Sequence, residues 1–342
     1  MKIGWRGALG FLISAALLVF LFRRIDWHEV QQRLDHANWW LLVLASFGAT
    51  LMFPLRARRW RTILDPVAPR LPFGPLWRST AIGMMVNNVV PARAGELARA
   101  YALTREVPAL PFSTALASLV VDRVFDAIVV LLLLALAILA PGFPSGATIE
   151  GRSVTHLAAG FALIPAALLV ALYALVFFPA ALIRIFELIA RRVSPTIEAR
   201  GRDALQRFSE GLSVLRTPRH FVAVFGWTLL HWLVQPLAFW FGLKAVGIDV
   251  PWSATLFLQG VIVVGVAVPS SPGFFGVFET AGVAALALYG VSAGAAATWA
   301  ILFHIVSFIP ITVLGAVYFA RLGLTFGELG SAARESAGDA AG

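Results

Sequence analysis

The stretch IGMMVNNVVPARAGELAR, residues 82–99, is the most informative part of the sequence for the fold. It begins as an apolar segment and then meets two asparagines, a proline, a glycine, two arginines and a glutamate. Helix breakers and ionisable groups are costly inside a bilayer, so such a segment indicates a functional site. The stretch at 261–280, VIVVGVAVPSSPGFFGVFET, is interrupted in a similar way, with Val-Pro, a later Gly and then a Glu.

The composition indicates a membrane protein with several spanning helices. Hydrophobic residues make up 59% and charged residues 13% of the 342 residues, whereas soluble domains are about one-quarter charged. Nearly all of the net charge of +9 comes from Arg between apolar runs. There it orients the protein and meets anionic lipid, so we predict no nucleic-acid partner. The absence of Cys excludes thiolate chemistry and cysteine metal sites.

The positions of charges predict six full spans. The first is an uncleaved span at 7–22, and the second begins after Trp39-Trp40 and ends near Arg56, where a strongly basic loop follows. The positive-inside rule places this loop and the N-terminus in the cytoplasm. The other spans are expected at 119–140, 157–178, 221–243 and 295–320.

The two interrupted stretches complete an inverted repeat. The charges of the loops fit alternate sides of the membrane only if neither interrupted stretch crosses it. The stretch at 76–104 must then enter from the cytoplasm and return to it, and the stretch at 253–289 must enter from outside and return there. Each is expected to form a broken or re-entrant helical hairpin. Each half, 1–140 and 157–321, then holds three spans and one hairpin. An odd number of spans inserts the halves in opposite senses, as in many secondary transporters. The predicted fold is an all-α polytopic membrane protein with a single transmembrane domain over 1–342.

A polar, Arg-rich segment at 179–220 is expected on the cytoplasmic side. Its apolar residues recur at helical spacing in two sets: Leu182, Ile185, Phe186 and Ile189, and Leu205, Phe208, Leu212 and Leu215. This pattern predicts amphipathic helices on the inner leaflet, with a solvated linker as the alternative. The small, polar tail 322–342 is expected to fray in the cytoplasm.

The first hairpin carries a candidate anion site. Pro91 is expected to break the helix and leave free backbone N–H groups near Gly95, and a helix N-terminus attracts anions. Arg93 can bind a phosphate through two hydrogen bonds, and Glu96 lies three residues from both Arg93 and Arg99. One interpretation is a site for an anionic headgroup; the other is an internal ion-pair network that lets the hairpin be buried. Such a network could open to admit a ligand.

A second charged motif, VDRVFD at 121–126, lies where the span at 119–140 begins. Asp122 and Asp126 are four residues apart and face the same way on a helix. They could bind a cation, relay a proton or pair with the arginines of the hairpin. The alternative is that they only hold the helix at the interface, and the neighbouring Arg123 favours pairing.

The second hairpin has one charge. Ser270 and Ser271 offer hydroxyls, and Gly273 permits a close approach of backbones. Glu279 stands alone in an apolar setting, where it could carry a proton. The alternatives for Glu279 are a distant Arg partner or contact with water outside.

The predicted binding residues are Asn87, Asn88, Arg93, Glu96, Arg99, Asp122, Arg123, Asp126, Ser270, Ser271, Gly273 and Glu279. The isolated His231 and His304 are interpreted as partners in helix–helix hydrogen bonds. The sequence has no Gly-rich phosphate loop, HExxH motif or nucleophile elbow. We therefore predict no catalytic residue, no metal and no cofactor.

Four motifs occur in a specific order: RxRRW at 56–60, NNxxPxRxGE at 87–96, DRxxD at 122–126 and PxSPGxxGxxE at 269–279. In this combination the chain resembles the lysylphosphatidylglycerol synthase transmembrane-region family, from about residue 6 to residue 321. Familiar members often have Glu-Arg where this chain has Asp122-Arg123. The resemblance implies movement of a lipid or lipid-linked headgroup across the bacterial inner membrane.

The leading prediction is a lipid flippase in the cell inner membrane that binds a phosphate-bearing or polyprenyl-linked lipid and is not an enzyme. Because only 322–342 follow the last expected span, we expect no aminoacyl transfer by this chain itself. One alternative is a non-transporting partner that docks a cytosolic lipid-modifying enzyme or glycosyltransferase on 179–220. Another is a membrane enzyme that acts on lipid phosphate.

Overall fold

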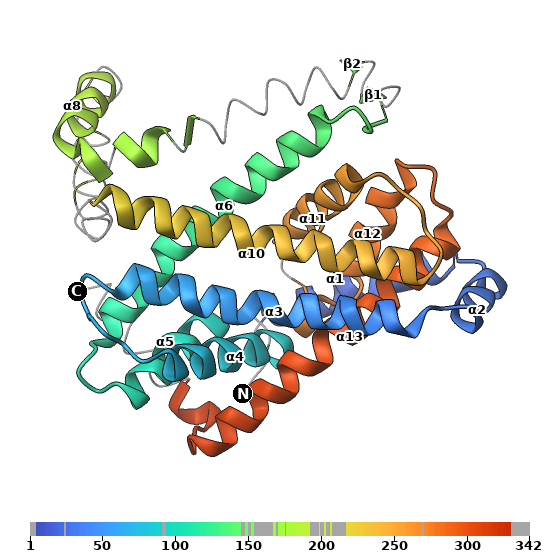
Figure 1. Ribbon diagram of the computed structural model, residues 1–342, viewed down its shortest axis with the longest axis horizontal. Helices are drawn as coiled ribbons and strands as arrows, with labels where there is room; N and C mark the ends of the chain where they lie inside the picture. The colour runs from blue at the N-terminus through green and yellow to red at the C-terminus, as the bar shows by residue number, and fades with distance from the viewer. Residues whose placement is uncertain are drawn as a thin grey trace.

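The chain forms a bundle of helices (Figure 1). The computed structural model describes residues 5–23, 25–90, 94–144, 148–149, 152–153, 167–168, 170–174, 176–191, 198, 202, 206, 217–267 and 270–329. The longer helices are α1 (Trp5–Phe22), α3 (Trp39–Leu64), α6 (Phe112–Leu139), α10 (Pro218–Ala245) and α13 (Ala293–Arg321). The shorter ones are α2 (Trp27–Asp35), α4 (Phe73–Val89), α5 (Gly95–Glu106), α8 (Pro179–Ala190), α11 (Trp252–Val266) and α12 (Val277–Ala287), with a 3₁₀ turn, η3 (Pro272–Phe274). Two-residue strands β1 (Thr148–Ile149) and β2 (Arg152–Ser153) pair antiparallel.

Three helices in the described part of the chain, α3, α10 and α13, are long and apolar enough to cross a membrane. At 1.5 Å per residue, the 26 residues of α3 extend about 39 Å, more than the roughly 30 Å of a hydrocarbon core. The 28-residue α6 is equally long but carries the charged motif at 122–126. The predicted class, a helical membrane protein, is thus confirmed, while the number of spans stays a prediction.

The antiparallel pair α3 and α10 forms the centre of the bundle (Figure 1). The Asn38 N–H donates to the Ala245 carbonyl over 2.8 Å, so the start of α3 meets the end of α10. Small residues let the two helices approach closely: a Cβ added to Gly48 would lie 3.1 Å from the Ala238 Cβ. Residues of α11, α12 and the first part of α13 pack against this pair in one large apolar core.

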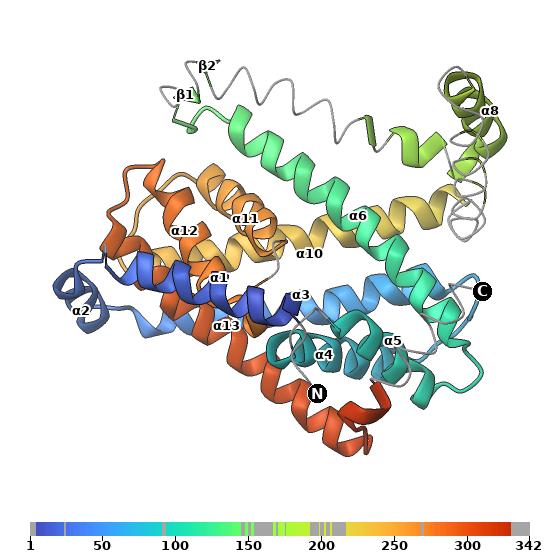
Figure 2. The same cartoon turned by 180° about the vertical axis from the view of Figure 1, so that it is seen from behind.

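Two pairs of short helices flank this centre: the first hairpin consists of α4 and α5, and the second of α11 and α12. Helix α4 packs against α5 and α13, and α11 packs against α12 and α6. In Figures 1 and 2, α4 and α5 lie toward the end of the bundle where α3 ends, and α11 and α12 toward the end where it begins. The 17 residues of α4 and the 15 of α11 extend only about 26 and 23 Å. Each is therefore shorter than a hydrocarbon core.

Two helix boundaries differ from the predictions. Helix α3 continues past Arg56 to Leu64, so the predicted basic loop begins as helix. Arg59 is fully buried there, and pairing with carboxylates explains why it need not lie in water. Helix α6 begins at Phe112, so its charged motif lies within the helix and not at its start.

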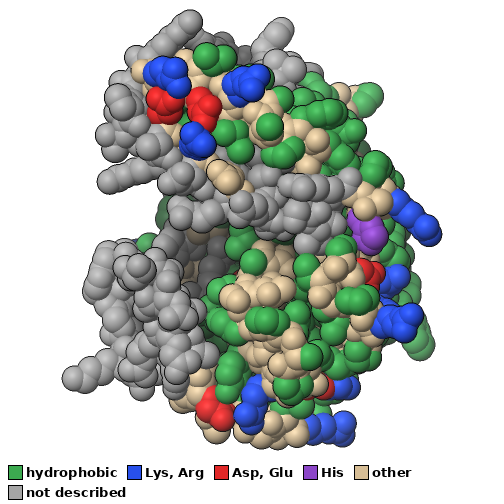
Figure 3. Space-filling model, turned by 90° about the vertical axis from the view of Figure 1, so that its left-hand side faces the viewer, with side chains coloured by type: hydrophobic (Ala, Val, Ile, Leu, Met, Phe, Trp, Pro, Cys, Tyr) green, Lys and Arg blue, Asp and Glu red, His purple; other side chains and the backbone are tan. Residues whose placement is uncertain are grey.

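The amphipathic segment is described only in part. Helix α8 matches the first predicted set of apolar residues, and its Ile185 and Leu188 side chains are exposed. The second set at 205–215, most of the expected span at 157–178 and the end of the tail lie outside the described residues. Figure 3 looks onto the end of the molecule that carries α8 and shows Lys and Arg side chains scattered over it.

Candidate functional site

Seven charged side chains meet where the first hairpin packs on the bundle, and we call them the charged cluster. They come from three helices: Arg56 and Arg59 from α3, Glu96 and Arg99 from α5, and Asp122, Arg123 and Asp126 from α6. The structure thus brings together five of the predicted binding residues and adds two arginines of the RxRRW motif. Arg93 lies outside the described residues.

Arg59 is the centre of the charged cluster. Its Nη2 lies 2.5 Å from Asp122 Oδ1, and its Nη1 lies 2.6 Å from Asp126 Oδ1. Nη1 also donates to Thr228 Oγ1 on α10 over 3.2 Å. The side chains of Arg59 and Asp122 have no exposed surface. Buried charges persist only when paired, so these contacts join α3, α6 and α10.

Asp126 connects the charged cluster to α10 and to the surface. Its Oδ1 accepts from Trp232 Nε1 over 2.7 Å, and its Oδ2 accepts from Arg123 Nη1 over 3.3 Å. Arg123 also pairs with Glu96 on the first hairpin, and its side chain is 45% exposed. The charged cluster is therefore buried at Arg59 and reaches solvent or headgroups at Arg123.

Arg99 and Arg56 are held less completely. Arg99 Nη1 donates to Asp122 Oδ2 over 3.2 Å, and its guanidinium lies 4.1 Å from the centre of the Trp60 ring. Arg56 Nη2 is 3.7 Å from Asp122 Oδ2 and 3.8 Å from Asp126 Oδ2, too far for hydrogen bonds. Among the described residues, Arg56 Nε, Arg99 Nε and Nη2, and Arg59 Nε and Nη2 are buried without hydrogen bonds, although Arg59 Nη2 is held by its ion pair with Asp122. Four arginines against three carboxylates leave one excess positive charge in the charged cluster.

A small cavity borders these two arginines. Its walls are Arg56, Thr80, Gly83, Met84, Asn87, Gly95, Glu96 and Arg99, and its volume of about 10 Å³ holds about one water. The predicted free N–H at Gly95 is not free, because it donates to Asn87 Oδ1 over 2.8 Å. A phosphate would need more room, so the first hairpin must move before an anionic headgroup can reach Arg56 and Arg99.

Replacing Gly95 by alanine is expected to destabilise the first hairpin. A Cβ there would lie 2.2 Å from the Gly83 carbonyl oxygen and 2.4 Å from Asn87 Cγ. Overpacking of this kind costs about 1–3 kcal/mol. The free energy of unfolding in mixed micelles measures the effect. Gly226→Ala in α10 is the control, because nothing lies within 4 Å of its added Cβ; equal stability of the two variants would contradict this packing.

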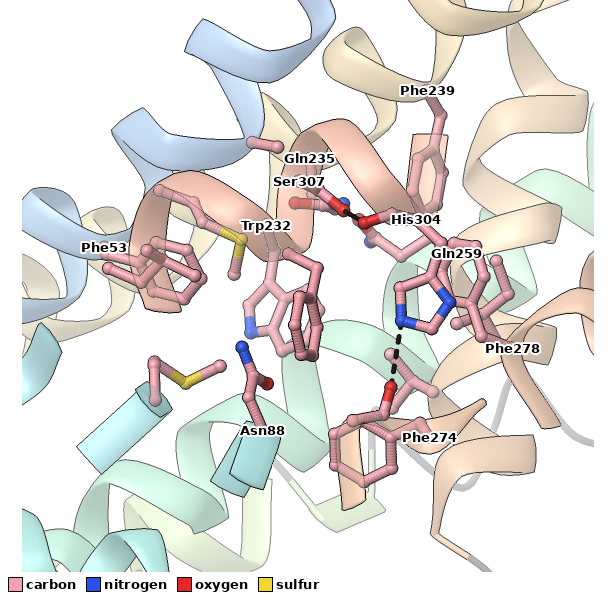
Figure 4. A pocket seen from close by; sticks show the side chains of 18 residues that line it. Phe53, Asn88, Trp232, Gln235, Phe239, Gln259, Phe274, Phe278, His304 and Ser307 are labelled. Carbon is pink, nitrogen blue, oxygen red and sulfur yellow. Dashed lines mark hydrogen bonds between the residues drawn. The ribbon is translucent and has the colours of Figure 1, made fainter. Parts of the chain in front are cut away.

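A larger cavity lies between the two hairpins, and we call it the central cavity (Figure 4). Its volume is about 190 Å³, and aromatic side chains and three amides line it. Asn88 donates to Thr312 Oγ1 over 2.7 Å, whereas neither amide atom of the buried Gln259 has a hydrogen-bond partner in the described structure. Met84 lines both cavities, so the first hairpin connects them.

The break in the second hairpin needs unusual backbone angles. Gly273, Phe274 and Gly276 have φ of 69°, 62° and 83°, in the left-handed region that glycine tolerates best. The Ser271 N–H donates to Ser14 Oγ of α1 over 2.9 Å. A Cβ on Gly276 would lie 2.6 Å from the Ser14 carbonyl oxygen, so the break sits directly on α1. Ser270 belongs to the same break and forms no part of the charged cluster.

We predicted that Glu279 stands alone, and this is wrong because the structure gives it two partners. Its Oε2 accepts from the Gly276 N–H over 2.7 Å, which caps α12. Its Oε1 lies 2.5 Å from His304 Nδ1 of α13, and His304 Nε2 lies 2.9 Å from the Gly273 carbonyl oxygen. A dashed line in Figure 4 marks the bond to Gly273. His304 therefore connects α13 with the break at Gly273 and with the first turn of α12 at Glu279.

The described members of the predicted set fall into two groups, one on the first hairpin and α6 and the other on the second hairpin. Sequence reasoning missed Arg56 and Arg59 in the charged cluster, the bond from Trp232 to Asp126, and the pairing of His304 with Glu279. The RxRRW motif contains a signal for the first two, because residues three apart share a helix face. Within the described residues, no three His, Asp or Glu side chains are arranged to hold a metal ion.

Comparison with known proteins finds relatives along most of the chain. The family described as lysylphosphatidylglycerol synthase TM region matches residues 7–315. A UPF0104 membrane protein of Methanothermobacter thermautotrophicus is 25% identical over 338 residues, covering 92% of this chain and 93% of that protein. The glycosyltransferase AglD of Haloferax volcanii is 35% identical over 117 residues, which are 34% of this chain and 19% of AglD. The match thus spans about a fifth of the glycosyltransferase.

Proposed function

Because the chain belongs to the lysylphosphatidylglycerol synthase transmembrane-region family, we propose that it is a flippase for a phosphate-bearing lipid or lipid-linked headgroup. The observation that carries this proposal is the excess positive charge of the charged cluster, which lies beside a broken hairpin. A transporter for anionic headgroups needs cations that can exchange a carboxylate for a phosphate. Arg56 and Arg99 have unused donors for this exchange.

The proposed binding step begins with movement of the first hairpin. Once the small cavity widens, a phosphate can bind to Arg56 and Arg99, and guanidinium groups bind phosphate through paired, charge-assisted hydrogen bonds. Asp122 and Asp126, which are themselves paired with Arg59, hold the two phosphate-binding arginines in place. The headgroup then passes along Met84 into the central cavity, while the acyl or polyprenyl chains stay in the bilayer.

The packing of the helices supports an inverted repeat. The central pair α3 and α10 consists of the second expected span of each half. Helix α4 packs on α13, and its counterpart α11 packs on α6. Because each pair joins a hairpin helix of one half to the last span of the other half, exchange of the halves preserves the contacts. Such repeats place the substrate site at their interface, where the central cavity lies.

The distribution of charge supports a cytoplasmic position for the charged cluster. Arg58, Arg61 and Arg219 lie at the end of the bundle where α3 ends and α10 begins. At the opposite end Arg33 and Lys244 are each paired with an acid, Glu29 and Asp249. Basic residues face the cytoplasm in most membrane proteins, so we place both chain termini and the first hairpin on that side of the inner (plasma) membrane.

Translocation in proteoliposomes tests the proposal. Fluorescent analogues of phosphatidylglycerol, a polyprenyl phosphate and a neutral glycosyl diacylglycerol are placed in both leaflets, and a membrane-impermeant reductant bleaches the outer leaflet. The purified protein should increase the bleached fraction for at least one phosphate-bearing lipid and leave the bleached fraction of the glycosyl diacylglycerol unchanged relative to protein-free vesicles. Equal acceleration for neutral and anionic lipids would contradict a phosphate site.

A second candidate function is a non-transporting membrane partner of a glycosyltransferase or lipid-modifying enzyme. The partial match to a glycosyltransferase supports it, as does the exposed apolar face of α8. The same assay separates the two functions, because a partner would translocate none of the lipids.

A further inference from the structure

We propose that Glu279 and His304 form a proton-binding site that latches the second hairpin onto α13, and that this proton is coupled to lipid movement. The coupling rests on the proposed function, whereas the proton site rests on the geometry of the two side chains alone. Both side chains are buried, with 4% and 6% of their surface exposed.

Hydrogen-bond accounting places a proton on the pair. Each ring nitrogen of His304 faces an oxygen: Nδ1 faces Glu279 Oε1 and Nε2 faces the Gly273 carbonyl. A carbonyl oxygen can only accept, so Nε2 must carry a hydrogen. Nδ1 then either carries a second hydrogen that it donates to a carboxylate, or accepts from a protonated Glu279. Both arrangements contain one proton more than a neutral imidazole beside a carboxylate.

Neighbouring groups hold both members of the pair in place. The Gly276 N–H donates to Glu279, which lies in the first turn of the 11-residue α12, where the helix dipole favours negative charge. The His304 ring stacks on Phe275 with centroids 4.5 Å apart and lies 4.7 Å from Phe278. Aromatic faces attract cations.

The neighbouring elements offer no competing charge. In the part of the central-cavity wall that the structure describes, His304 is the only titratable side chain. The amide side chains that share this wall, Gln259 of α11 and Asn88 of α4, are uncharged, and so is Ser14 of α1, which accepts from the Ser271 N–H. The proton therefore neutralises the pair, and no other titratable side chain lines the described wall of the cavity.

Loss of the proton would release the latch. A neutral imidazole has one hydrogen for two facing acceptors, so the bond to Gly273 or the bond to Glu279 must be given up. The bond to Gly273 holds a break whose backbone is strained at the next residue, Phe274, with φ of 62°. Deprotonation through the central cavity would therefore free the second hairpin to move, and rebinding of the proton would fix it again.

Nitrogen-15 NMR of histidine-labelled protein in nanodiscs tests the proton site. The chain has six His, and the spectrum of His304→Gln, subtracted from that of the wild type, assigns His304. At neutral pH both ring nitrogens of His304 should carry hydrogen. In Glu279→Gln the amide donates to Nδ1, so His304 should become neutral. A neutral His304 in the wild type, or an unchanged imidazolium in Glu279→Gln, would overturn the proposal.

Thr298→Ala is the matched control, because Thr298 is buried on the same helix, its hydroxyl donates to the Gly294 carbonyl over 2.8 Å, and it lies outside the wall of the central cavity. Its His304 signal should match that of the wild type. Coupling is measured as lipid translocation under an imposed pH gradient. Wild type and Thr298→Ala should change rate by up to about tenfold per pH unit, the limit for one bound proton.

Glu279→Gln should not respond to the pH gradient, and a response equal to that of the wild type would refute the coupling. If the wild type moves no lipid at all, the proposed function fails, and the NMR result still decides whether the pair binds a proton. The two proposals can therefore fail separately.

Discussion

Lipid translocation by Arg56→Gln is expected to fall at least about tenfold below the wild type while the fold remains intact. A hydrogen bond to a charged group contributes about 1.5–3 kcal/mol, and a tenfold effect corresponds to about 1.4 kcal/mol. Arg56 borders the small cavity, and its removal takes away the excess positive charge of the charged cluster. Its carboxylate neighbours are 3.7 and 3.8 Å away, so little structure depends on it. The proteoliposome assay measures the rate.

The control for this prediction is Arg78→Gln. Arg78 also lies on the first hairpin and forms an ion pair, with Glu106, but it belongs to neither the charged cluster nor the wall of the small cavity. Its translocation should stay within about twofold of the wild type, since partly exposed ion pairs contribute little. Equal loss in both variants would indicate a general effect of positive charge and not a site at Arg56.

Replacing Asp126 by alanine should have the largest effect on stability, a loss of about 3–5 kcal/mol, because it leaves a buried charge without its partner. Asp126 Oδ1 accepts from Arg59 over 2.6 Å and from Trp232 over 2.7 Å. Without it the fully buried Arg59 keeps only the carboxylate of Asp122. The free energy of unfolding in mixed micelles measures the loss.

Asp249→Ala provides the comparison, because Asp249 pairs with Lys244 at the surface with 88% of its side chain exposed. Exposed pairs contribute about 0–1 kcal/mol. If the Asp126 variant were no less stable than the Asp249 variant, the charged cluster would not hold α3, α6 and α10 together.

The membrane class and the two breaks between short helices could be predicted from the sequence because both follow from local costs. A proline or a charge in an apolar run is unfavourable wherever the chain goes. The end of α3 was predicted wrongly because counting charges treats each Arg as solvated. Arg59 instead pairs with Asp126, which lies 67 residues further along the chain, so Arg59 can be buried and α3 can continue past it.

The two sites could be predicted only as lists of residues. Local spacing indicated that Asp122 and Asp126 share a face, but not that Arg59 bridges them. In the same way, the sequence pattern indicated an isolated carboxylate at Glu279. Its partner, His304, lies 25 residues further on in another helix. Pairing between distant helices depends on how the bundle packs, which hydrophobic periodicity does not specify.

A reversible cross-link between α4 and α13 tests most directly whether the first hairpin must move to transport lipid. The chain has no Cys, and Asn88 Nδ2 lies 2.7 Å from Thr312 Oγ1, so Asn88→Cys combined with Thr312→Cys accepts a short linker that a reductant cleaves. Neither position carries charge, so the charged cluster is unchanged. Translocation should stop in the cross-linked protein and return after reduction, while the cysteine-free protein is unaffected by the linker. Translocation at the same rate before and after reduction would contradict the account.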